Sequence, residues 1–148
     1  MVIYLDANVI VSYLLYTEKT EEARKVLERE EAFATTINTL EEAVFVGMRL
    51  IFEEYYGDYK LKKFKKTLKQ NFEIYQQYLS NLNRLVSELP IVLLPVPSDL
   101  TSLVQVMEGY SLLPNDALIA LTCKVQKIDK IATFDSDFRG VDFLKVIP

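Results

Sequence analysis

Four acidic side chains stand at positions in the sequence from which a reactive site is easily built. Asp6 follows a short apolar run, and Asp135 follows another one near the end of the chain. Glu42 and Asp116 each come shortly after residues that start helices. Carboxylate oxygens are the ligands that Mg²⁺ and Mn²⁺ prefer in proteins. The four acids are therefore a candidate site for a hard divalent cation.

Acids that share one pocket repel each other, and this repulsion indicates what else the site must hold. Two like charges about 4 Å apart repel by ~4 kcal/mol at an effective dielectric constant near 20. Several such pairs rival the roughly 5–15 kcal/mol that stabilise a whole domain. A divalent cation removes the repulsion, and it can also orient a water and stabilise the leaving oxygen of a phosphodiester. The pattern thus favours hydrolysis of phosphodiesters by a metal-activated water.

The composition of the chain narrows the chemistry further. Its 148 residues include no histidine and a single cysteine, Cys123. The lack of histidine excludes Ser-His-Asp and Cys-His catalysis and histidine-bound zinc, and one cysteine excludes an internal disulfide. With 17 basic against 21 acidic residues the net charge is −4, so a polyanionic partner needs a local basic patch. No apolar run approaches the ~18 residues of a membrane span, and no signal segment opens the chain, so we expect a cytoplasmic protein without membrane contact.

Apolar runs alternate with helical periodicities along the sequence. The runs predict five strands, at Val2–Leu5, Ala32–Thr36, Ile91–Leu94, Lys130–Phe134 and Phe143–Ile147. The periodicities predict the intervening helices, which we place at Val9–Tyr16 with Asn8 as its cap, at Glu18–Glu30, from Thr39 through Ile51, across Tyr59–Leu89 with one break, from Ser98 or Asp99 to Gly109, and at Asp116–Gln126.

Strands separated by helices predict an α/β fold. We expect a three-layer sandwich in which a five-stranded parallel sheet of order 3-2-1-4-5 has helices on both faces. Residues 1–148 form one domain with one core, which includes an extended helical segment at about 53–89. In this order strands one and four are neighbours at the point where the winding reverses, and ligands bind there in open α/β sheets. Asp6 and Asp135 are then side by side.

Each candidate acid also has an interpretation without catalysis. Asp6 and Asn8 are compatible with a turn at a strand end and a helix cap. Thr39 and Glu42 have the spacing of a capping box, in which the glutamate only closes the first turn of its helix. Asp116 has the place of a first-turn acid that the helix dipole favours. Asp135-Ser136-Asp137 is compatible with an Asx turn that leaves a strand.

Four motifs in chain order decide between these interpretations. They are Leu5-Asp6-Ala7-Asn8, Thr39-Leu40-Glu41-Glu42, Asn115-Asp116-Ala117-Leu118-Ile119-Ala120 and Thr133-Phe134-Asp135-Ser136-Asp137-Phe138. Together they resemble the motifs of the PIN-domain ribonuclease family across nearly the whole chain, most of all those of single-domain VapC-type toxins. The resemblance implies a Mg²⁺- or Mn²⁺-dependent endoribonuclease that acts on RNA as the toxin of a toxin–antitoxin pair and is held inactive by a VapB-type antitoxin.

The resemblance also implies roles for individual residues. Asp6, Glu42, Asp116 and Asp135 match the family's catalytic, metal-binding acids, and Asp137 matches an additional metal ligand. Asn8 and Thr133 match polar positions that support the site. The doubled Glu41-Glu42 leaves the second acid open between the two, and we favour Glu42 because Thr39 lies three places before it.

A dense basic run lies in the extended helical segment and has two interpretations. It consists of Lys60, Lys62, Lys63, Lys65, Lys66 and Lys69. Such a run is compatible with an ordinary solvated helix face. It is also compatible with a patch that binds RNA phosphates near an otherwise acidic crevice. The apolar and tyrosine-rich helices around it are in keeping with a homodimer.

Two other functions are compatible with the same acids. In a phosphatase of the haloacid-dehalogenase type Asp6 is the nucleophile, but that family has a second aspartate where this chain has Asn8. A non-catalytic module that binds RNA or an antitoxin uses the same pocket without turnover. Cleavage of RNA that depends on a divalent ion separates the nuclease from both.

Overall fold

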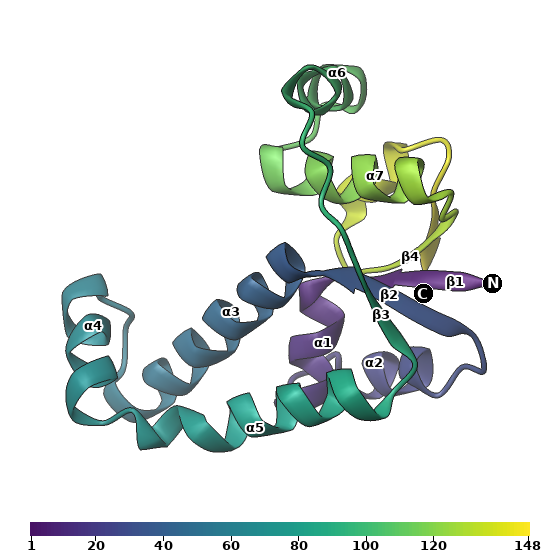
Figure 1. The fold of residues 1–148 in the computed structure, drawn as a ribbon. Helices are drawn as coiled ribbons and strands as arrows, with labels where there is room; N and C mark the ends of the chain where they lie inside the picture. The colour runs from purple at the N-terminus through teal and green to yellow at the C-terminus, as the bar shows by residue number, and fades with distance from the viewer.

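The computed structural model describes residues 1–148 and is built around a parallel sheet with helices on both faces (Figure 1). Its five strands are hydrogen-bonded in the order β3-β2-β1-β4-β5, and every neighbouring pair is parallel. This confirms the predicted fold class and strand order. The strands are β1 (Val2–Leu5), β2 (Ala32–Thr36), β3 (Ile91–Leu94), β4 (Lys130–Ala132) and β5 (Lys145–Ile147), so the last two are shorter than predicted.

Seven α-helices and one 3₁₀ helix connect the strands. Helices α1, α2, α3 and α5 cover one face of the sheet, while α6, α7 and η1 belong to the other (Figure 1). No helix of the chain is both long and apolar enough to cross a membrane. The helices are α1 (Ala7–Leu14), α2 (Thr20–Leu27), α3 (Ile37–Tyr56), α4 (Leu61–Gln70), α5 (Glu73–Glu88), α6 (Leu100–Tyr110), α7 (Pro114–Gln126) and η1 (Ser136–Gly140).

The central strand β1 divides the hydrophobic core in two. Successive side chains of a strand point to opposite faces of the sheet. Ile3 and Leu5 therefore pack with the helices of one layer, whereas Tyr4 packs with α7 and η1 in the other, and all three are fully buried. Burial on both faces makes the strand apolar throughout, and Asp6 is the first polar residue beyond it.

Two predicted helix starts were wrong, and the reason is the same in both. We expected Asn8 and Thr39 as caps, but the strands pass into the helices without a loop. Asp6 caps α1 with its own carboxylate, which accepts a hydrogen bond from the Ala7 N–H at 2.8 Å. Thr36, the last residue of β2, caps α3, and Thr39 is instead buried against Tyr4, 2.7 Å between the hydroxyl oxygens. Glu42 thus lies in the second turn of α3 and closes no capping box.

Other boundaries also differ from the sequence-based prediction. Helix α2 is shorter than the predicted Glu18–Glu30, and α7 begins at Pro114 rather than at Asp116. Gly109 lies inside α6, which ends at Tyr110 and is followed by the cap residue Ser111 in a left-handed conformation (φ 55°). These shifts are of the size expected when caps are inferred from residue type alone.

The long helical segment folds into an arm that extends away from the sheet. Helix α3 runs outward, α4 lies at the tip, and α5 returns to the sheet (Figure 1). The predicted break falls at Asn71, between α4 and α5. The arm has a small core of its own, made by the buried side chains of Met48, Ile51, Phe52, Phe64, Tyr75 and Tyr78.

Gly47 makes the close approach of α3 and α5 possible. The Tyr78 ring lies where a Cβ of residue 47 would stand, and the Tyr78 hydroxyl donates to the Ala43 carbonyl at 2.6 Å. We therefore expect Gly47→Ala to lower the free energy of unfolding by about 1–3 kcal/mol, measured by urea denaturation, because the ring must leave its place.

Gly109→Ala is the matched control for this substitution. Gly109 is also helical, but no other side chain or distant backbone lies within 4 Å of the point that an added methyl carbon would occupy. That variant should gain up to about 1 kcal/mol, because alanine favours a helix over glycine. Equal gains in both variants would contradict the packing described for Gly47.

Candidate metal centre

Asp6 lies at the carboxyl end of β1 and is 5% exposed. One carboxylate oxygen accepts from the Ala7 N–H, and the other accepts from the Thr133 hydroxyl at 2.7 Å. Burial raises the pKa of Asp6 most strongly, the two hydrogen bonds lower it, and the charge of Asp135 raises it further. The side chain is therefore fixed in position, while its negative charge is incompletely compensated.

Thr133 and Asn8 join the ends of β1 and β4. The Thr133 hydroxyl donates to Asp6 and accepts from the Asn8 amide at 3.3 Å and from the Asp135 N–H at 3.0 Å. The side-chain oxygen of Asn8, Oδ1, accepts in turn from the Phe134 N–H at 3.2 Å. Thr133 thus contacts Asp6 directly and Asn8 holds Thr133 in place, and neither residue adds a charge to the site.

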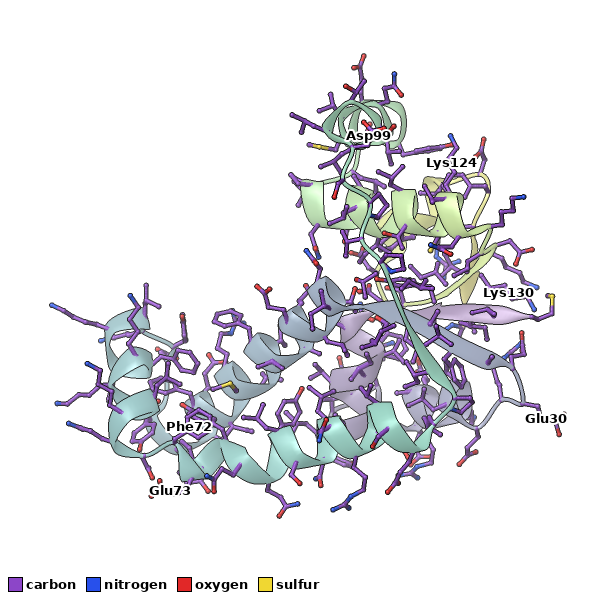
Figure 2. All side chains as sticks on the ribbon, viewed as in Figure 1. Glu30, Phe72, Glu73, Asp99, Lys124 and Lys130 are labelled. Carbon is purple, nitrogen blue, oxygen red and sulfur yellow. The ribbon has the colours of Figure 1, made fainter.

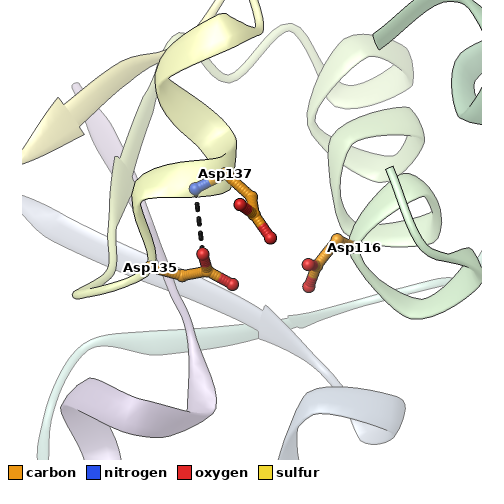
Figure 3. Close-up of side chains that lie close together, drawn as sticks. All are labelled: Asp116, Asp135 and Asp137. Atoms are coloured by element: carbon orange, nitrogen blue, oxygen red, sulfur yellow. Dashed lines mark hydrogen bonds between the residues drawn. The ribbon is translucent and has the colours of Figure 1, made fainter. Parts of the chain in front are cut away.

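Asp116, Asp135 and Asp137 form the tightest group of acids (Figure 3). One oxygen from each lies within 4.8 Å of the others. Asp116 comes from the first turn of α7, and the other two come from the start of η1, where the Asp135 carboxylate accepts from the Asp137 N–H at 2.9 Å. The Asx turn expected as an alternative is therefore present, and it serves to hold two carboxylates toward the third.

The pKa of Asp116 shows how crowded the site is. Its pKa is raised to about 6, first by burial and then by the charges of Asp135, Asp6, Glu42 and Asp137, in that order. All five acids named from the sequence therefore belong to one electrostatic group. No lysine or arginine forms an ion pair with any of them.

Glu42 reaches the site from the second turn of α3. Its pKa is raised by burial and by the charge of Asp6, is lowered by a hydrogen bond from Asn115, and is raised again by Asp135. That bond runs from the Asn115 amide to a Glu42 oxygen over 3.2 Å. Glu41 is exposed on the same helix and has no such partner. Of the two glutamates, Glu42 is the one that belongs to the acidic group.

Two features of the site lie outside the set of site residues predicted from the sequence. The bond from Asn115 depends on the approach of α3 to α7, which no local pattern reveals, although Asn115 opens one of the four motifs. A cleft of about 290 Å³ also adjoins Asp135, with Lys19 and Arg139 among its lining residues. Arg139 makes no ion pair, and Lys19 pairs with Glu22 at 3.6 Å.

The predicted basic run is not part of this site. Helix α4, which carries all of it but Lys60, lies at the tip of the arm (Figure 1). The acids come instead from the end of β1, the second turn of α3, the first turn of α7 and the start of η1. Any contribution of these lysines therefore acts at a distance from the acids.

The acidic group fits a hard divalent cation. All its donors are carboxylate oxygens, which suit Mg²⁺ or Mn²⁺ and offer neither nitrogen nor sulfur to zinc. Three of them already lie close enough to share one ion. The raised pKa values have the sign expected of ligands gathered without their counter-charge.

Comparison with known proteins identifies the fold family. The family model of the PIN domain matches residues 3–144. The chain belongs to the PIN domain family. Two relatives from Methanocaldococcus jannaschii support this: Ribonuclease VapC6 is 31% identical over 98% of this chain and 95% of its own length. Ribonuclease VapC2 is 32% identical over 98% of this chain and 92% of its own.

Solved structures share the architecture of this PIN domain. The sarcin-ricin loop cleaving toxin VapC20 of Mycobacterium tuberculosis has a TM-score of 0.65 at 13% identity, with 99% of both chains covered. VapBC2 of Rickettsia felis, solved with a DNA fragment from its promoter, has a TM-score of 0.62 at 17% identity, with 99% of this chain and 97% of that chain covered. At these identities the likeness concerns the fold. The family match decides against the haloacid-dehalogenase alternative.

Repulsion among the acids allows the acidic group to be tested by protein stability, without a substrate. An acid whose pKa is higher in the folded protein binds its proton more tightly there, so the free energy of unfolding falls as the pH rises from about 4 to 6. In the metal-free protein we expect Asp116→Asn to remove part of that fall. Because Asp116 is only half-buried, the gain at pH 7 should be on the order of 1–2 kcal/mol, or a few degrees in Tm.

Thermal unfolding in EDTA at several pH values measures this effect. Saturating Mg²⁺ should reduce the gain of Asp116→Asn, because the ion stabilises the intact site. Asp58→Asn, at an exposed position between α3 and α4, is the control and should change little. A metal-free Tm that falls in Asp116→Asn would contradict the clustering of the acids.

Thr133 gives a second test, which concerns the link between β1 and β4. Thr133→Val keeps the shape but leaves Asp6, Asn8 and the Asp135 N–H each without one partner. We expect a loss of about 2–3 kcal/mol in the free energy of unfolding, because unpaired buried groups are costly. Thr133→Ser keeps the hydroxyl and should lose about 1 kcal/mol. If urea denaturation finds the valine variant as stable as the serine variant, the hydroxyl does not hold the two strands together.

Proposed function

We propose that this PIN domain is a Mg²⁺- or Mn²⁺-dependent endoribonuclease and the toxin of a toxin–antitoxin pair. The observation that supports this most directly is that four other carboxylates lie close enough to raise the pKa of Asp116 together, with no lysine or arginine paired to any of the five. The two relatives named as ribonucleases, 31% and 32% identical, favour RNA as the substrate.

The roles of the acids follow from their places. Asp116, Asp135 and Asp137 would hold the ion, with Asp6 and Glu42 beside them, because one carboxylate oxygen of each of the first three lies within 4.8 Å of the others. When bound, the ion supplies a Lewis acid that lowers the pKa of a water and offsets charge on the phosphodiester. Asp116, with a pKa of about 6, must give up its proton to serve as a ligand.

Neighbouring residues position these acids and the substrate. Thr133 orients Asp6, and Asn115 orients Glu42, each by a hydrogen bond to a carboxylate oxygen. Arg139 and Lys19, in the cleft beside Asp135, offer positive charge where a flanking phosphate of the RNA would lie. Cations there offset part of the repulsion between RNA and the acidic pocket.

The likeness to solved toxin–antitoxin structures also favours a protein partner. We propose a VapB-type antitoxin as the partner that holds the enzyme inactive, supported by the likeness to VapBC2 and to a toxin–antitoxin complex from Klebsiella pneumoniae (TM-score 0.57). We also propose a homodimer. Large apolar side chains on β3 and α6 stay exposed in the single chain, among them Val92 at 55%, Leu93 at 51% and Leu100 at 75%.

Cleavage of RNA by acid-to-amide variants tests the activity. A bound metal contributes several kcal/mol to catalysis, and each 1.36 kcal/mol is tenfold in rate. We therefore expect Asp6→Asn, Asp116→Asn and Glu42→Gln each to lower the cleavage rate by roughly 10²-fold. EDTA should abolish cleavage, and Mg²⁺ or Mn²⁺ should restore it.

Glu41→Gln is the matched control for Glu42→Gln. It removes one charge from the adjacent, exposed position and should leave the rate within about twofold, because exposed charges are screened. Undiminished activity in both Asp6→Asn and Asp116→Asn would exclude the proposed site. RNA binding without cleavage under any divalent ion would favour the non-catalytic module instead.

A further inference from the structure

Helix α4 presents an unbroken row of positive charge. Lys62, Lys65, Lys66 and Lys69 have the spacing i, i+3, i+4 and i+7, which places them on one helix face. Phe64 and Thr67 are the buried side chains of the opposite face. All four lysines are exposed, and none forms an ion pair. Lys60 and Lys63 flank the row, and we call these six residues the lysine face.

On two other surface helices of this chain, α2 and α3, basic residues form ion pairs with acids of the same helix. Helix α2 mixes the two signs, and Arg24 pairs with Glu21 at 2.7 Å. On α3, Arg49 lies 3.7 Å from Glu53. Helix α4 has no acid at all. Like charges at these spacings destabilise a helix by a few tenths of a kcal/mol per pair, and a ten-residue helix is marginal by itself. Solvation alone therefore does not account for the lysine face.

Packing fixes the direction in which the lysine face points. The Phe64 ring lies 5.6 to 5.9 Å from the rings of Phe52, Tyr59 and Tyr75, measured between centroids. The Thr67 hydroxyl lies 2.7 Å from that of Tyr75. These contacts hold the apolar side of α4 against the arm. The side chains of α4 that end in nitrogen accordingly point away from the rest of the protein into solvent (Figure 2).

We propose that the lysine face of α4 binds RNA phosphates as a second contact, remote from the acidic pocket. The proposal rests on the proposed function, since it assigns the substrate of that pocket a second point of attachment. Residues 60–70 carry six lysines and no acid, so the rest of the chain has a net charge of −10 against −4 for the whole. Charge complementarity therefore favours a polyanion as the partner of this face.

The geometry of α3 sets the length of RNA that can use both contacts. Fourteen residues separate Glu42 from Tyr56, which is roughly 20 Å along the helix axis. At about 3.4 Å per phosphate of a stacked strand, this distance is about six nucleotides. A shorter RNA reaches the acidic pocket alone. The lysine face should therefore matter for long substrates and be irrelevant to very short ones.

Two quadruple variants with the same change in net charge test this. The first is Lys62→Gln, Lys65→Gln, Lys66→Gln and Lys69→Gln, which keeps good helix formers throughout. The control is Lys25→Gln, Arg84→Gln, Lys124→Gln and Lys145→Gln, four exposed positions without ion pairs on other elements. Thermal unfolding confirms that both remain folded. The probes are a labelled RNA hairpin of about 24 nucleotides, several times the calculated span, and a tetranucleotide.

Binding of the hairpin is measured in EDTA, so that it does not depend on catalysis. In the α4 variant we expect Kd to rise at least ~10-fold and the slope of log K against log salt to fall by about three, because up to four phosphate contacts are lost. The control should move less than ~3-fold, since exposed charges away from the contact act only through the general field. The corresponding four Lys→Arg changes should restore binding.

Cleavage with Mg²⁺ gives the second readout. The α4 variant should cleave the tetranucleotide at the wild-type rate and lose kcat/KM on the hairpin through KM. Equal weakening of hairpin binding in both quadruple variants would overturn the proposal in favour of bulk charge. Unchanged hairpin binding with lost binding to vesicles of anionic lipid would overturn it in favour of a membrane surface. A wild-type protein that binds the hairpin but cleaves neither RNA would instead refute the proposed function, while the binding data still decide on α4.

Discussion

Repulsion among carboxylates at the ends of β1 and β4 is the constraint on which the rest of this structure depends. Asp6 is held almost out of contact with water, and Asp116 has a pKa of about 6 because burial and four other acids act on it. Folding must hold these groups together before any cation offsets their charge. The remainder of the molecule supplies that stability, chiefly through apolar burial on both sides of the sheet.

The topology of the sheet explains why the acids meet at all. Strands β1 and β4 are neighbours although more than a hundred residues separate them in sequence, and parallel strands end at the same edge. The Thr133 hydroxyl and the Asn8 amide then join the two strand ends by hydrogen bonds. A neutral link of this kind holds the acids close without adding a cation that would compete with the metal. The same arrangement places the acids at the switch point of the sheet, where open α/β folds bind ligands.

Much of this could be predicted from the sequence because it depends on local periodicity. The apolar runs predicted the strands, their alternation with helices predicted a parallel sheet with right-handed crossovers, and four short motifs indicated the family. Features that depend on how two elements meet could not be predicted. Thr39 has the residue type and spacing of a helix cap, yet its hydroxyl forms a hydrogen bond with the hydroxyl of Tyr4 in β1. Asn115 donates a hydrogen bond to Glu42 because α7 approaches α3, and nothing in the sequence of either helix indicates that the two approach each other. The roles of the acids in catalysis, and of the lysines in binding, stay predictions.

Negative charge in this chain gathers at the ends of β1 and β4, whereas positive charge gathers at the tip of the arm, on and next to α4. A pocket that gathers five acids repels RNA over distances up to the Debye length, about 8–10 Å at physiological salt. A bound divalent ion offsets only two of the five negative charges. Lys19 and Arg139, in the cleft beside Asp135, offset part of this repulsion, and cations beyond the Debye length add an attraction that the acids do not oppose. Helix α3 extends roughly 20 Å from Glu42 to Tyr56, and the six lysines follow at residues 60–69, on and next to α4. Beyond the Debye length the repulsion by the acids is screened, so the lysines attract a polyanion without opposition. On this argument the arm lets one small acidic protein bind a polyanion and still hold a metal.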